Sequence, residues 1–410
     1  MAQRDEERLV VGLDVGTTKI CCLVAVVDEN GAVSVKGQGT ALSTGMAEGQ
    51  VVNMQQTIAS IKEAVDEAQR ASDCMIKSAC VGVAGRHIRS FNSNGVVAIR
   101  NRHVSEEDIK RVIEGALTVK MPLDRELLHS IAQEFVVDNF SGIKAPLGMQ
   151  GVRLEANVHV VTGDRNAIGN IVNCVLKSGL DIKDLVLESV ASAEAVLQPS
   201  ERSLGVALID MGGGTSDIAL YCGDSIRFSA VVGMGGDNLT HDVAVKFRTD
   251  VENAELLKCT YGCCLSSLIE EDLNIEVPTQ AGDGVMLVRR STLCDQLELR
   301  VEEILKLVNH QLINSGYDKN INSVVLTGGS SLLPGMTELA EQIFDRRVRR
   351  GSPNTVVGLS EIVEDPRFST AVGLVLHTIK NRGVQASSGP RNSQWLKRWC
   401  AKIFGEASSR

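Results

Sequence analysis

The chain has 410 residues, which is too long for one hydrophobic core and indicates two or more domains. Its formal net charge is −9 and its aromatic residues are only eight Phe, three Tyr and two Trp, so nucleic acid is not expected as a main partner. No run of 18 apolar residues offers a membrane span. The 11 cysteines are scattered through a chain that opens without a signal peptide, which indicates a reducing cytosol.

The first motif follows a short polar start. Leu9–Lys19 reads LVVGLDVGTTK, an apolar run typical of a buried strand followed by a Gly turn and hydroxyl residues. Glycine lets backbone N–H groups approach an anion, and an Asp at a strand end can orient hydrated Mg²⁺. The residues expected to serve a phosphate group here are Asp14, Gly16, Thr17, Thr18 and Lys19.

Residues 1–88 and 163–199 are predicted to form one half-domain, with a helix at Gln55–Arg70. Residues 89–162 differ in pattern from these flanking parts. Strands are expected at Ser90–Arg100 and Arg153–Thr162, and between them Ser105 opens a helix with the capping-box spacing. This segment is therefore predicted to be an inserted α+β subdomain.

The second motif repeats the first 196 residues later. Gly205–Asp217 reads GVALIDMGGGTSD, and Asp210 takes the place of Asp14. A single Asp-Gly turn is weak evidence because such turns join strands in many folds. Two copies indicate two related half-domains that enclose one nucleotide, the second copy contributing Gly212, Gly213, Gly214 and Thr215.

A smaller subdomain is predicted over 236–304, within a second half-domain of residues 200–235 and 305–380. Gly235 and Gly236 precede an expected helix, Asp237–Phe247. Glu255 and Lys258 lie on one face of the next helix, where they form either a surface ion pair of little energy or part of a ligand site. A hairpin-like stretch is expected at 276–284.

The rest of the second half-domain is expected to contain a helix at Val301–Leu312, a third Gly loop and a closing helix at Ser369–Lys380. The loop SVVLTGGSSLLPGM places Gly328, Gly329 and Ser330 at a strand end, where backbone without side chains suits a flat purine or ribose. Taken alone, it is equally consistent with a plain strand-to-helix turn. Four arginines between 346 and 350 predict a charged edge strand.

The C-terminal segment has a different composition. Residues 381–392 are small and polar, as in a flexible linker, and 393–404 form one apolar helical stripe with a basic flank. This pattern is typical of an interfacial membrane helix, with docking on the protein core as the alternative. The residues expected at the membrane are Trp395, Leu396, Lys397, Arg398, Trp399, Lys402, Ile403 and Phe404.

The order LDVGTTK, IDMGGGTSD, LTGGSSLLPG resembles the actin/Hsp70/hexokinase superfamily. The inserted segment, the tail and strings such as VVNMQQTIASIKEAVDEA and GVRLEANVHVVTG make the chain similar to the FtsA family of bacterial cell-division proteins. This resemblance implies an α/β actin-like ATPase fold. It comprises two RNase H-like half-domains (1A and 2A), the inserted subdomain (1C), the small subdomain (2B) and a C-terminal amphipathic helix.

The resemblance also implies ATP and Mg²⁺ as cofactors. Loop residues 17–19 and 212–215 would hold the phosphates, and Asp14 and Asp210 would orient Mg²⁺ through water. The adenosine would be enclosed by Gly235, Gly236, Glu255, Lys258, Gly328, Gly329 and Ser330. Glu188, together with Asp210, is a candidate catalytic residue that helps place a water, although a carboxylate at a helix start is also favoured by the helix dipole alone.

The implied partners are the C-terminal tail of FtsZ at the 236–304 subdomain, further copies of the chain in a polymer, an anionic membrane surface and other division proteins. The implied location is the cytoplasmic face of the inner membrane at the septum, with at most weak ATPase activity. The alternatives are a small-molecule kinase of the same fold, an Hsp70-like chaperone ATPase and a pilus-assembly relative.

Overall fold

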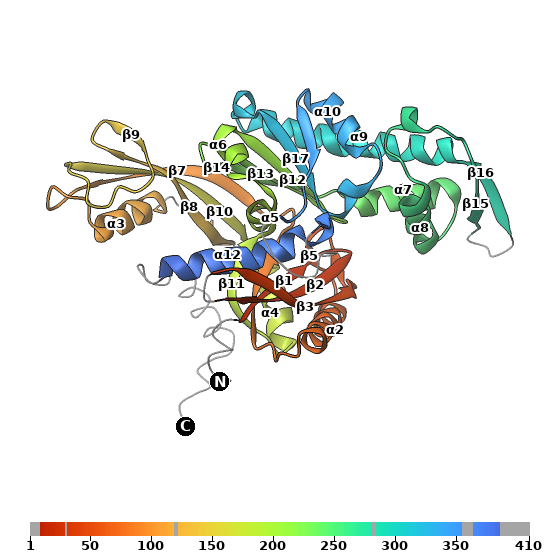
Figure 1. Ribbon diagram of the computed structural model, residues 1–410, viewed down its shortest axis with the longest axis horizontal. Helices are drawn as coiled ribbons and strands as arrows, with labels where there is room; N and C mark the ends of the chain where they lie inside the picture. Colours follow the sequence, from red (N-terminus) through yellow and green to blue (C-terminus); the bar gives the residue numbers. More distant parts are fainter. Residues whose placement is uncertain (1–8, 29–30, 119–121, 280–283, 355–363, 386–410) are drawn as a thin grey trace.

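A computed structural model gives the fold over residues 9–28, 31–118, 122–279, 284–354 and 364–385. Figure 1 shows two sheet-centred halves, one above the other, with a further unit at each end of the molecule. The predicted membrane helix and most of its linker lie outside the described residues.

The first half contains a five-stranded sheet in the order β11-β6-β1-β2-β3. Its strands are β1 (Leu9–Val15), β2 (Lys19–Val27), β3 (Val33–Leu42), β6 (Ser78–Val83) and β11 (Asp181–Leu187). The first three are antiparallel neighbours, whereas β6 runs parallel to β1 and to β11. Helix α2 (Met54–Ser72), which confirms the predicted Gln55–Arg70, packs on β3, and α4 (Arg165–Lys177) lies beside α2 and the short pair β4 (Met46–Ala47) and β5 (Gln50–Val51).

The second half repeats this plan in the order β14-β13-β12-β17-β18. Its strands are β12 (Val206–Met211), β13 (Ser216–Cys222), β14 (Ser225–Val232), β17 (Ser323–Thr327) and β18 (Arg347–Arg350). Again three antiparallel strands are followed by two parallel ones. The shared order confirms the expected related half-domains, and β18 is the edge strand that the arginines predicted. Helices α6 (Pro199–Leu204) and α10 (Met336–Phe344) and the 3-10 turn η2 (Asp318–Asn320) complete this half.

Two helices lie between the sheets: α5 (Glu188–Val196) and α12 (Ser369–Gln385), as Figure 1 shows. Helix α12 packs on β1, β2 and β6, while α5 contacts β11 on one side and β12 and β13 on the other. Helix α12 continues to Gln385, beyond the expected end at Lys380, so the first five residues of the predicted linker are helical.

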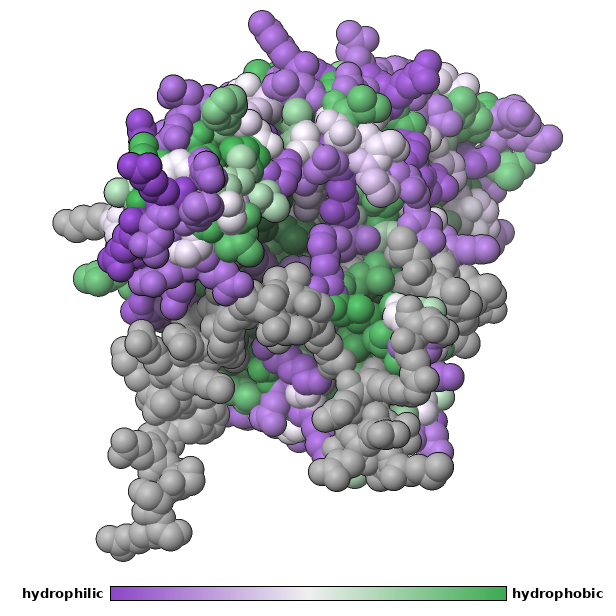
Figure 2. Space-filling model, turned by 60° about the vertical axis from the view of Figure 1, so that its left-hand side comes forward, coloured by the Kyte–Doolittle hydropathy of each residue, from purple (hydrophilic) through white to green (hydrophobic). Residues whose placement is uncertain are grey.

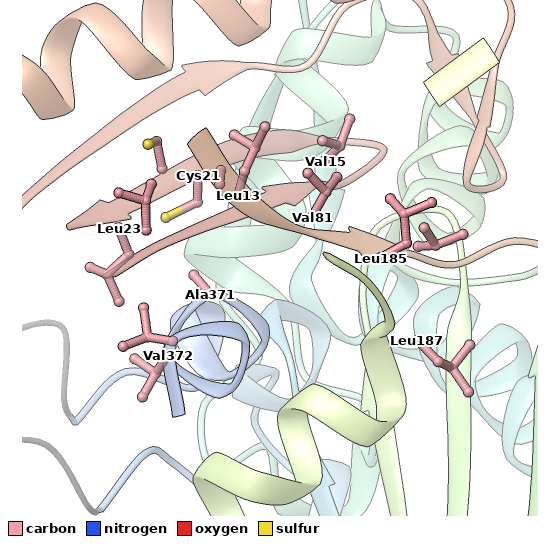
Figure 3. Close-up of a cluster of buried hydrophobic side chains, with 14 of the residues drawn as sticks. Leu13, Val15, Cys21, Leu23, Val81, Leu185, Leu187, Ala371 and Val372 are labelled. Carbon is pink, nitrogen blue, oxygen red and sulfur yellow. The ribbon is translucent and has the colours of Figure 1, made fainter. Parts of the chain in front are cut away.

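The core of the first half explains why β1 and β2 read as continuous apolar runs. Leu13, Leu23 and Val81 have no exposed surface, and Figure 3 shows them in one buried cluster with Ala371 and Val372 of α12. Strands covered on both faces lose the polar alternation of half-buried strands. Gly12 permits this packing, because a Cβ there would lie 2.6 Å from the carbonyl oxygen of Ala371.

The inserted unit is an antiparallel sheet in the order β7-β10-β8-β9 with one helix, as expected. It comprises β7 (Arg89–Ala98), α3 (Glu106–Ala116), β8 (Arg125–Val137), β9 (Phe140–Ile143) and β10 (Arg153–Asp164). The capping box is confirmed: Asp108 N–H donates to Ser105 Oγ at 3.2 Å, and Ser105 N–H donates to Asp108 Oδ2 at 3.0 Å.

The unit at the other end contains α7 (Gly236–Phe247), α8 (Val251–Tyr261), the turn η1 (Ser266–Leu268) and the hairpin of β15 (Asn274–Pro278) and β16 (Val285–Arg289). The prediction of a helix confined to Val301–Leu312 was wrong at both ends. Helix α9 spans Arg290–Asn314 and joins this unit to the second half. Its buried apolar positions begin at Leu293 and belong to one core that the small unit shares with the second sheet.

The surface in Figure 2 mixes polar and apolar residues, and a hollow with apolar side chains at its floor opens near the middle of that face. Isolated apolar residues on a surface are ordinary. Among the described residues, no helix has both the length and the apolar character that a membrane crossing requires.

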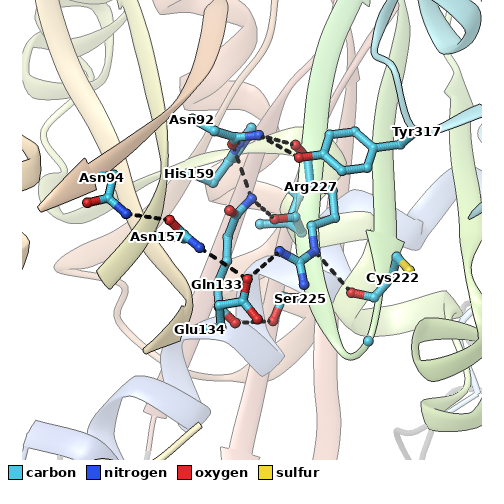
Figure 4. Close-up of polar contacts among 12 residues, drawn as sticks. Asn92, Asn94, Gln133, Glu134, Asn157, His159, Cys222, Ser225, Arg227 and Tyr317 are labelled. Atoms are coloured by element: carbon cyan, nitrogen blue, oxygen red, sulfur yellow. Dashed lines mark hydrogen bonds and ion pairs between the residues drawn. The ribbon is translucent and has the colours of Figure 1, made fainter. Parts of the chain in front are cut away.

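A polar interface joins the inserted unit to β14, the edge strand of the second half (Figure 4). Carbonyl groups of β14 accept hydrogen bonds from side chains: Asn92 Nδ2 donates to Arg227 O at 3.0 Å and Gln133 Nε2 to Ile226 O at 2.7 Å. Lys144 Nζ donates to Gly223 O at 2.6 Å. Asn92 and Gln133 thus satisfy carbonyl groups of the β14 edge, and Lys144 binds the turn that precedes it.

His159 lies at the centre of this interface, 1% exposed, between Asn92 Oδ1 at 2.7 Å from its Nδ1 and Ser229 Oγ at 3.0 Å from its Nε2. Burial lowers the pKa of His159 from 6.5 to about 4. The unfolded chain therefore binds a proton near pH 6.5 that the folded chain does not take up until about pH 4. This group contributes stability above pH 6.5 that is lost as the pH falls.

We expect His159→Gln to reduce the loss of folding stability that occurs as the pH falls. Between pH 7.5 and 5.5 the unchanged chain should lose about 1 kcal/mol more than the variant. Thermal or urea unfolding at the two pH values measures the difference. The control is His103→Gln at an exposed histidine, and equal pH slopes for His159→Gln and the unchanged chain would contradict the expectation.

Candidate functional site

The two Gly motifs form equivalent hairpins at the junction of the halves. Asp14 is the penultimate residue of β1 and pairs with Cys21, and Asp210 is the penultimate residue of β12 and pairs with Asp217. We call residues 14–19 loop 1 and residues 210–215 loop 2. The same hairpin geometry therefore presents one Asp from each half.

The loops meet face to face. A Cβ on Gly213 would overlap Thr18 Oγ1, and one on Gly214 would lie 2.5 Å from Thr17 Oγ1. Thr18 Oγ1 also donates to Asp237 Oδ1 at 3.1 Å, at the start of α7. Since only backbone fits opposite the threonines, this close approach requires glycine at both positions of loop 2.

Lys19 lies apart from the two threonines. Its Nζ donates to Arg367 O at 3.0 Å and lies 3.9 Å from the centre of the Phe368 ring, both in the turn η4 (Pro366–Phe368). Burial raises the pKa values of Asp14 and Asp210, and the charge of Lys19 opposes this rise. The structure thus places Lys19 at the rim of the site, within electrostatic reach of the carboxylates.

Four carboxylates gather between the sheets: Asp14, Glu188, Asp210 and Asp217. Burial raises the pKa of Asp14 to about 7, against the attraction of Lys19 and with repulsion from Asp210. Burial also raises the pKa of Asp217 to about 8, and that of Glu188 well above its ordinary value, with further repulsion from the other acids. A site that makes buried carboxylates hold protons near neutral pH is suited to a cation.

Asp217 was missed as a site residue by the sequence analysis. The missed signal is its place opposite Asp210 across the hairpin, seven residues away, as Cys21 is opposite Asp14. Thr215 Oγ1 donates to Asp217 Oδ2 at 2.7 Å, while Asp217 Oδ1 is buried without a hydrogen-bond partner among the described residues. A buried oxygen of this kind calls for a water or an ion.

The donor set fits hydrated Mg²⁺ rather than a directly chelated metal. Within the described part of the chain, no group of three or more His, Cys, Asp or Glu side chains is close enough to hold a metal ion. Mg²⁺ commonly keeps several waters and uses one or two carboxylates. Asp14 and Asp210 each present a carboxylate at the junction of the loops, and the water-mediated Mg²⁺ site stays a prediction.

Hydrogen bonds also connect loop 2 and the start of α7 with α8 and the third Gly loop. Ser330 Oγ, in the turn η3 (Gly329–Leu332), donates to Gly212 O at 2.9 Å. Gly236 N–H donates to the same carbonyl at 3.0 Å, and a Cβ on Gly236 would lie 2.6 Å from Ser330 Oγ. The structure therefore brings Gly212, Gly236 and Ser330 together, although they are far apart in sequence.

Glu255 and Lys258 of α8 form a partly buried ion pair beside the start of α7. Lys258 Nζ lies 2.6 Å from Glu255 Oε2 and donates to Gly236 O at 3.2 Å and to Thr240 Oγ1 at 2.9 Å. Burial alone would raise the pKa of Glu255, but Lys258 and the hydrogen bonds lower it overall. The pair is therefore tied to the α7 start and is more than a solvated surface contact.

Gly328 and Gly329 have different structural requirements. Gly328 has φ +82°, and a Cβ there would overlap Asp210 Oδ1 and lie 2.6 Å from Met211 O. Gly329 has no positive φ, and its nearest neighbour would be Arg367 Cγ at 3.5 Å. Only Gly328 is required by backbone conformation and space.

We expect Gly328→Ala to destabilise the protein by about 2–4 kcal/mol, because it combines a left-handed φ with an overlap in the core of the site. Gly329→Ala is the matched control and should cost less than about 1 kcal/mol. Unfolding of the purified variants measures both. Equal losses for the two neighbours would refute the geometric argument.

Comparisons with known proteins agree with this architecture. The family described as cell division protein FtsA matches residues 207–373, and the SHS2 domain inserted in FtsA matches residues 85–162. Cell division protein FtsA of Pseudomonas aeruginosa is 43% identical, covering 98% of this chain and 100% of that protein. The FtsA proteins of Neisseria meningitidis and Escherichia coli K12 are 38% and 35% identical, over 97% and 98% of this chain and 99% and 100% of theirs.

Two solved structures share the fold at low identity. A PilM-PilN type IV pilus biogenesis complex gives a TM-score of 0.66 at 16% identity, covering 90% of this chain and 98% of that one. MreB5 of Spiroplasma citri bound to ADP gives a TM-score of 0.57 at 14% identity, covering 93% of this chain and 100% of that one. These likenesses support the actin-like fold alone. The near-complete match to FtsA proteins shows that the chain belongs to the FtsA family of cell division proteins.

Proposed function

We propose that this protein is an ATP-binding, actin-like scaffold that tethers the FtsZ ring to the inner face of the cytoplasmic membrane at the septum and helps recruit other division proteins. The observation that carries the proposal is the pairing of two equivalent Asp-Gly hairpins across the junction of the halves. Each hairpin offers backbone N–H groups and hydroxyls, which can donate hydrogen bonds to phosphate oxygens.

ATP would be held by both halves at once. Thr17 and Thr18 from loop 1 and residues 212–215 from loop 2 would bind the phosphates, while Gly236, Lys258 and Ser330 would enclose the adenosine. Mg²⁺ would supply positive charge to the phosphates through waters held by Asp14 and Asp210. Glu188 would help place a water beside the phosphates, and burial and the neighbouring acids raise its pKa.

Nucleotide would then act as an assembly switch, since a ligand that bridges two halves favours one angle between them. Self-association has candidate surfaces at opposite ends of the molecule (Figure 1). Phe140 of β9 is 74% exposed, and Val285 and Leu287 of β16 are 58% and 67% exposed. A contact between two different surfaces repeats from copy to copy and produces a filament.

Membrane attachment is assigned to residues 393–404 on their sequence pattern. Each basic residue near an anionic surface contributes roughly 1 kcal/mol, and one short helix should bind reversibly. Linked copies in a polymer would bind far better through effective concentration.

Removal of residues 386–410, which leaves α12 intact, should abolish co-sedimentation with anionic liposomes and leave ATP binding unchanged. Trp399→Glu in the full chain should weaken pelleting at least about tenfold, because it places a charge on the apolar stripe. The control is Ser408→Glu, which adds the same charge outside the stripe. Equal pelleting of the truncated and full chains would assign the terminal segment to protein docking instead.

Binding of the FtsZ tail is assigned to the unit formed by α7, α8 and the first part of α9. Arg300 is a poor single test, because Asp242 and Glu303 already pair with it at 2.5 and 2.6 Å. Val245 and Leu299 lie on α7 and α9 and are 64% and 63% exposed, so they can be changed without loss of core packing.

We expect Val245→Glu or Leu299→Glu to weaken binding of a fluorescent FtsZ-tail peptide by about tenfold, the loss of one good apolar contact. Leu147→Glu, at a 55% exposed position of the inserted unit, is the control and should have no effect. Anisotropy titration measures the affinities. An unchanged affinity across exposed residues of 236–304 would remove this unit as the tail site.

A further inference from the structure

Two hydroxyl groups hold one oxygen of Asp210. Ser192 Oγ of α5 donates to Asp210 Oδ2 at 2.5 Å, and Thr370 Oγ1 of α12 donates to the same oxygen at 3.1 Å. The two hydroxyl oxygens are 3.0 Å apart. We call Ser192 and Thr370 the hydroxyl clamp; Ser192 has no exposed surface and Thr370 is 8% exposed.

The clamp joins Asp210 to helices outside its own sheet. Asp210 belongs to β12, whereas α5 follows β11 of the first half and α12 packs on β1 and β2. The two helices approach closely, since a Cβ on Gly373 of α12 would overlap the carbonyl oxygen of Ala191 in α5. Backbone packing therefore fixes the positions of both hydroxyls before any ligand binds.

The clamp also decides which carboxylate oxygen is available. Oδ2 is occupied by the hydroxyls, while Oδ1 lies beside Gly328, where a Cβ on Gly328 would meet it. A carboxylate among three other buried acids needs donors that keep it oriented, because repulsion favours its turning away. Hydrogen bonds to a charged group are the strong ones and suit this role.

We propose that Ser192 and Thr370 are positioning residues that present Asp210 Oδ1 to hydrated Mg²⁺ and tie Asp210 to the α5–α12 pair. This inference rests on the proposed nucleotide function. If the proposed nucleotide function holds, Mg²⁺ increases the affinity for nucleotide, and we call this increase the Mg²⁺ gain. Loss of the clamp should reduce the Mg²⁺ gain and leave the affinity measured without Mg²⁺ unchanged.

The test is binding of ADP to the full chain, measured by calorimetry with Mg²⁺ and again with EDTA. For Ser192→Ala and Thr370→Val, the Mg²⁺-dependent gain in affinity should fall at least about tenfold, as for loss of a hydrogen bond to a charged group, while affinity in EDTA stays within about twofold. Thr370→Ser keeps the hydroxyl and should keep the gain.

Ser369→Ala is the matched control. Ser369 is the neighbouring residue, 1% exposed, and its hydroxyl lies 2.6 Å from Thr327 Oγ1 rather than on Asp210. This variant loses a buried hydroxyl of the same helix and should keep the Mg²⁺ gain. Thermal unfolding checks that each variant folds; if Thr370→Val does not, the comparison of Ser192→Ala with Ser369→Ala decides.

An unchanged Mg²⁺ gain in Ser192→Ala would overturn the proposal, and so would an equal loss in Ser369→Ala, which would indicate general packing damage. If the unchanged chain binds ADP equally well with Mg²⁺ and with EDTA, the role proposed for the clamp is wrong, although nucleotide binding itself stands. Absence of ADP binding in both conditions would instead overturn the proposed function, and the clamp with it.

Discussion

Burial of four carboxylates at the junction of the two halves is the constraint on which the rest of the site depends. Asp14 and Glu188 come from the first half and Asp210 and Asp217 from the second, and burial together with repulsion raises the pKa of Asp14 to about 7 and of Asp217 to about 8. Acids placed in this way weaken the folded state at neutral pH unless a cation or a proton neutralises them. Such a cost is typical of a functional site rather than of a stabilising core.

The surrounding structure supports these acids with hydrogen bonds from several elements. Hydroxyls of Ser192 and Thr370 reach Asp210, and that of Thr215 reaches Asp217. Glycines at 213, 214 and 328 keep side chains out of the space between the loops. The hydroxyls orient the charges and the glycines leave backbone groups free to meet a ligand, so the two features are complementary.

The contacts between the halves are of two chemical kinds. Around α5 and α12 the packing is apolar and close, and it forms one core with the first sheet. Where the inserted unit meets β14, the contact is made by Asn92, Gln133, Lys144 and His159 through hydrogen bonds. Close apolar packing resists rearrangement, whereas hydrogen bonds can be exchanged with water at lower cost, so movement between the halves is more easily accommodated at the polar contact.

The sequence by itself determined the local units. Buried strands, Gly turns and the Ser105 capping box are set by residues close in the chain, and the repeat of Asp14 at Asp210 was enough to indicate two related halves. The family resemblance then implied the order of the subdomains. Tertiary structure alone decided what lies beside these units: Ser192 and Thr370 on one carboxylate oxygen, and α9 in a core that the small unit shares with the second half. Pairing partners, burial and pKa depend on residues far apart in the chain, 178 positions in the case of Ser192 and Thr370, and no local pattern records such distances.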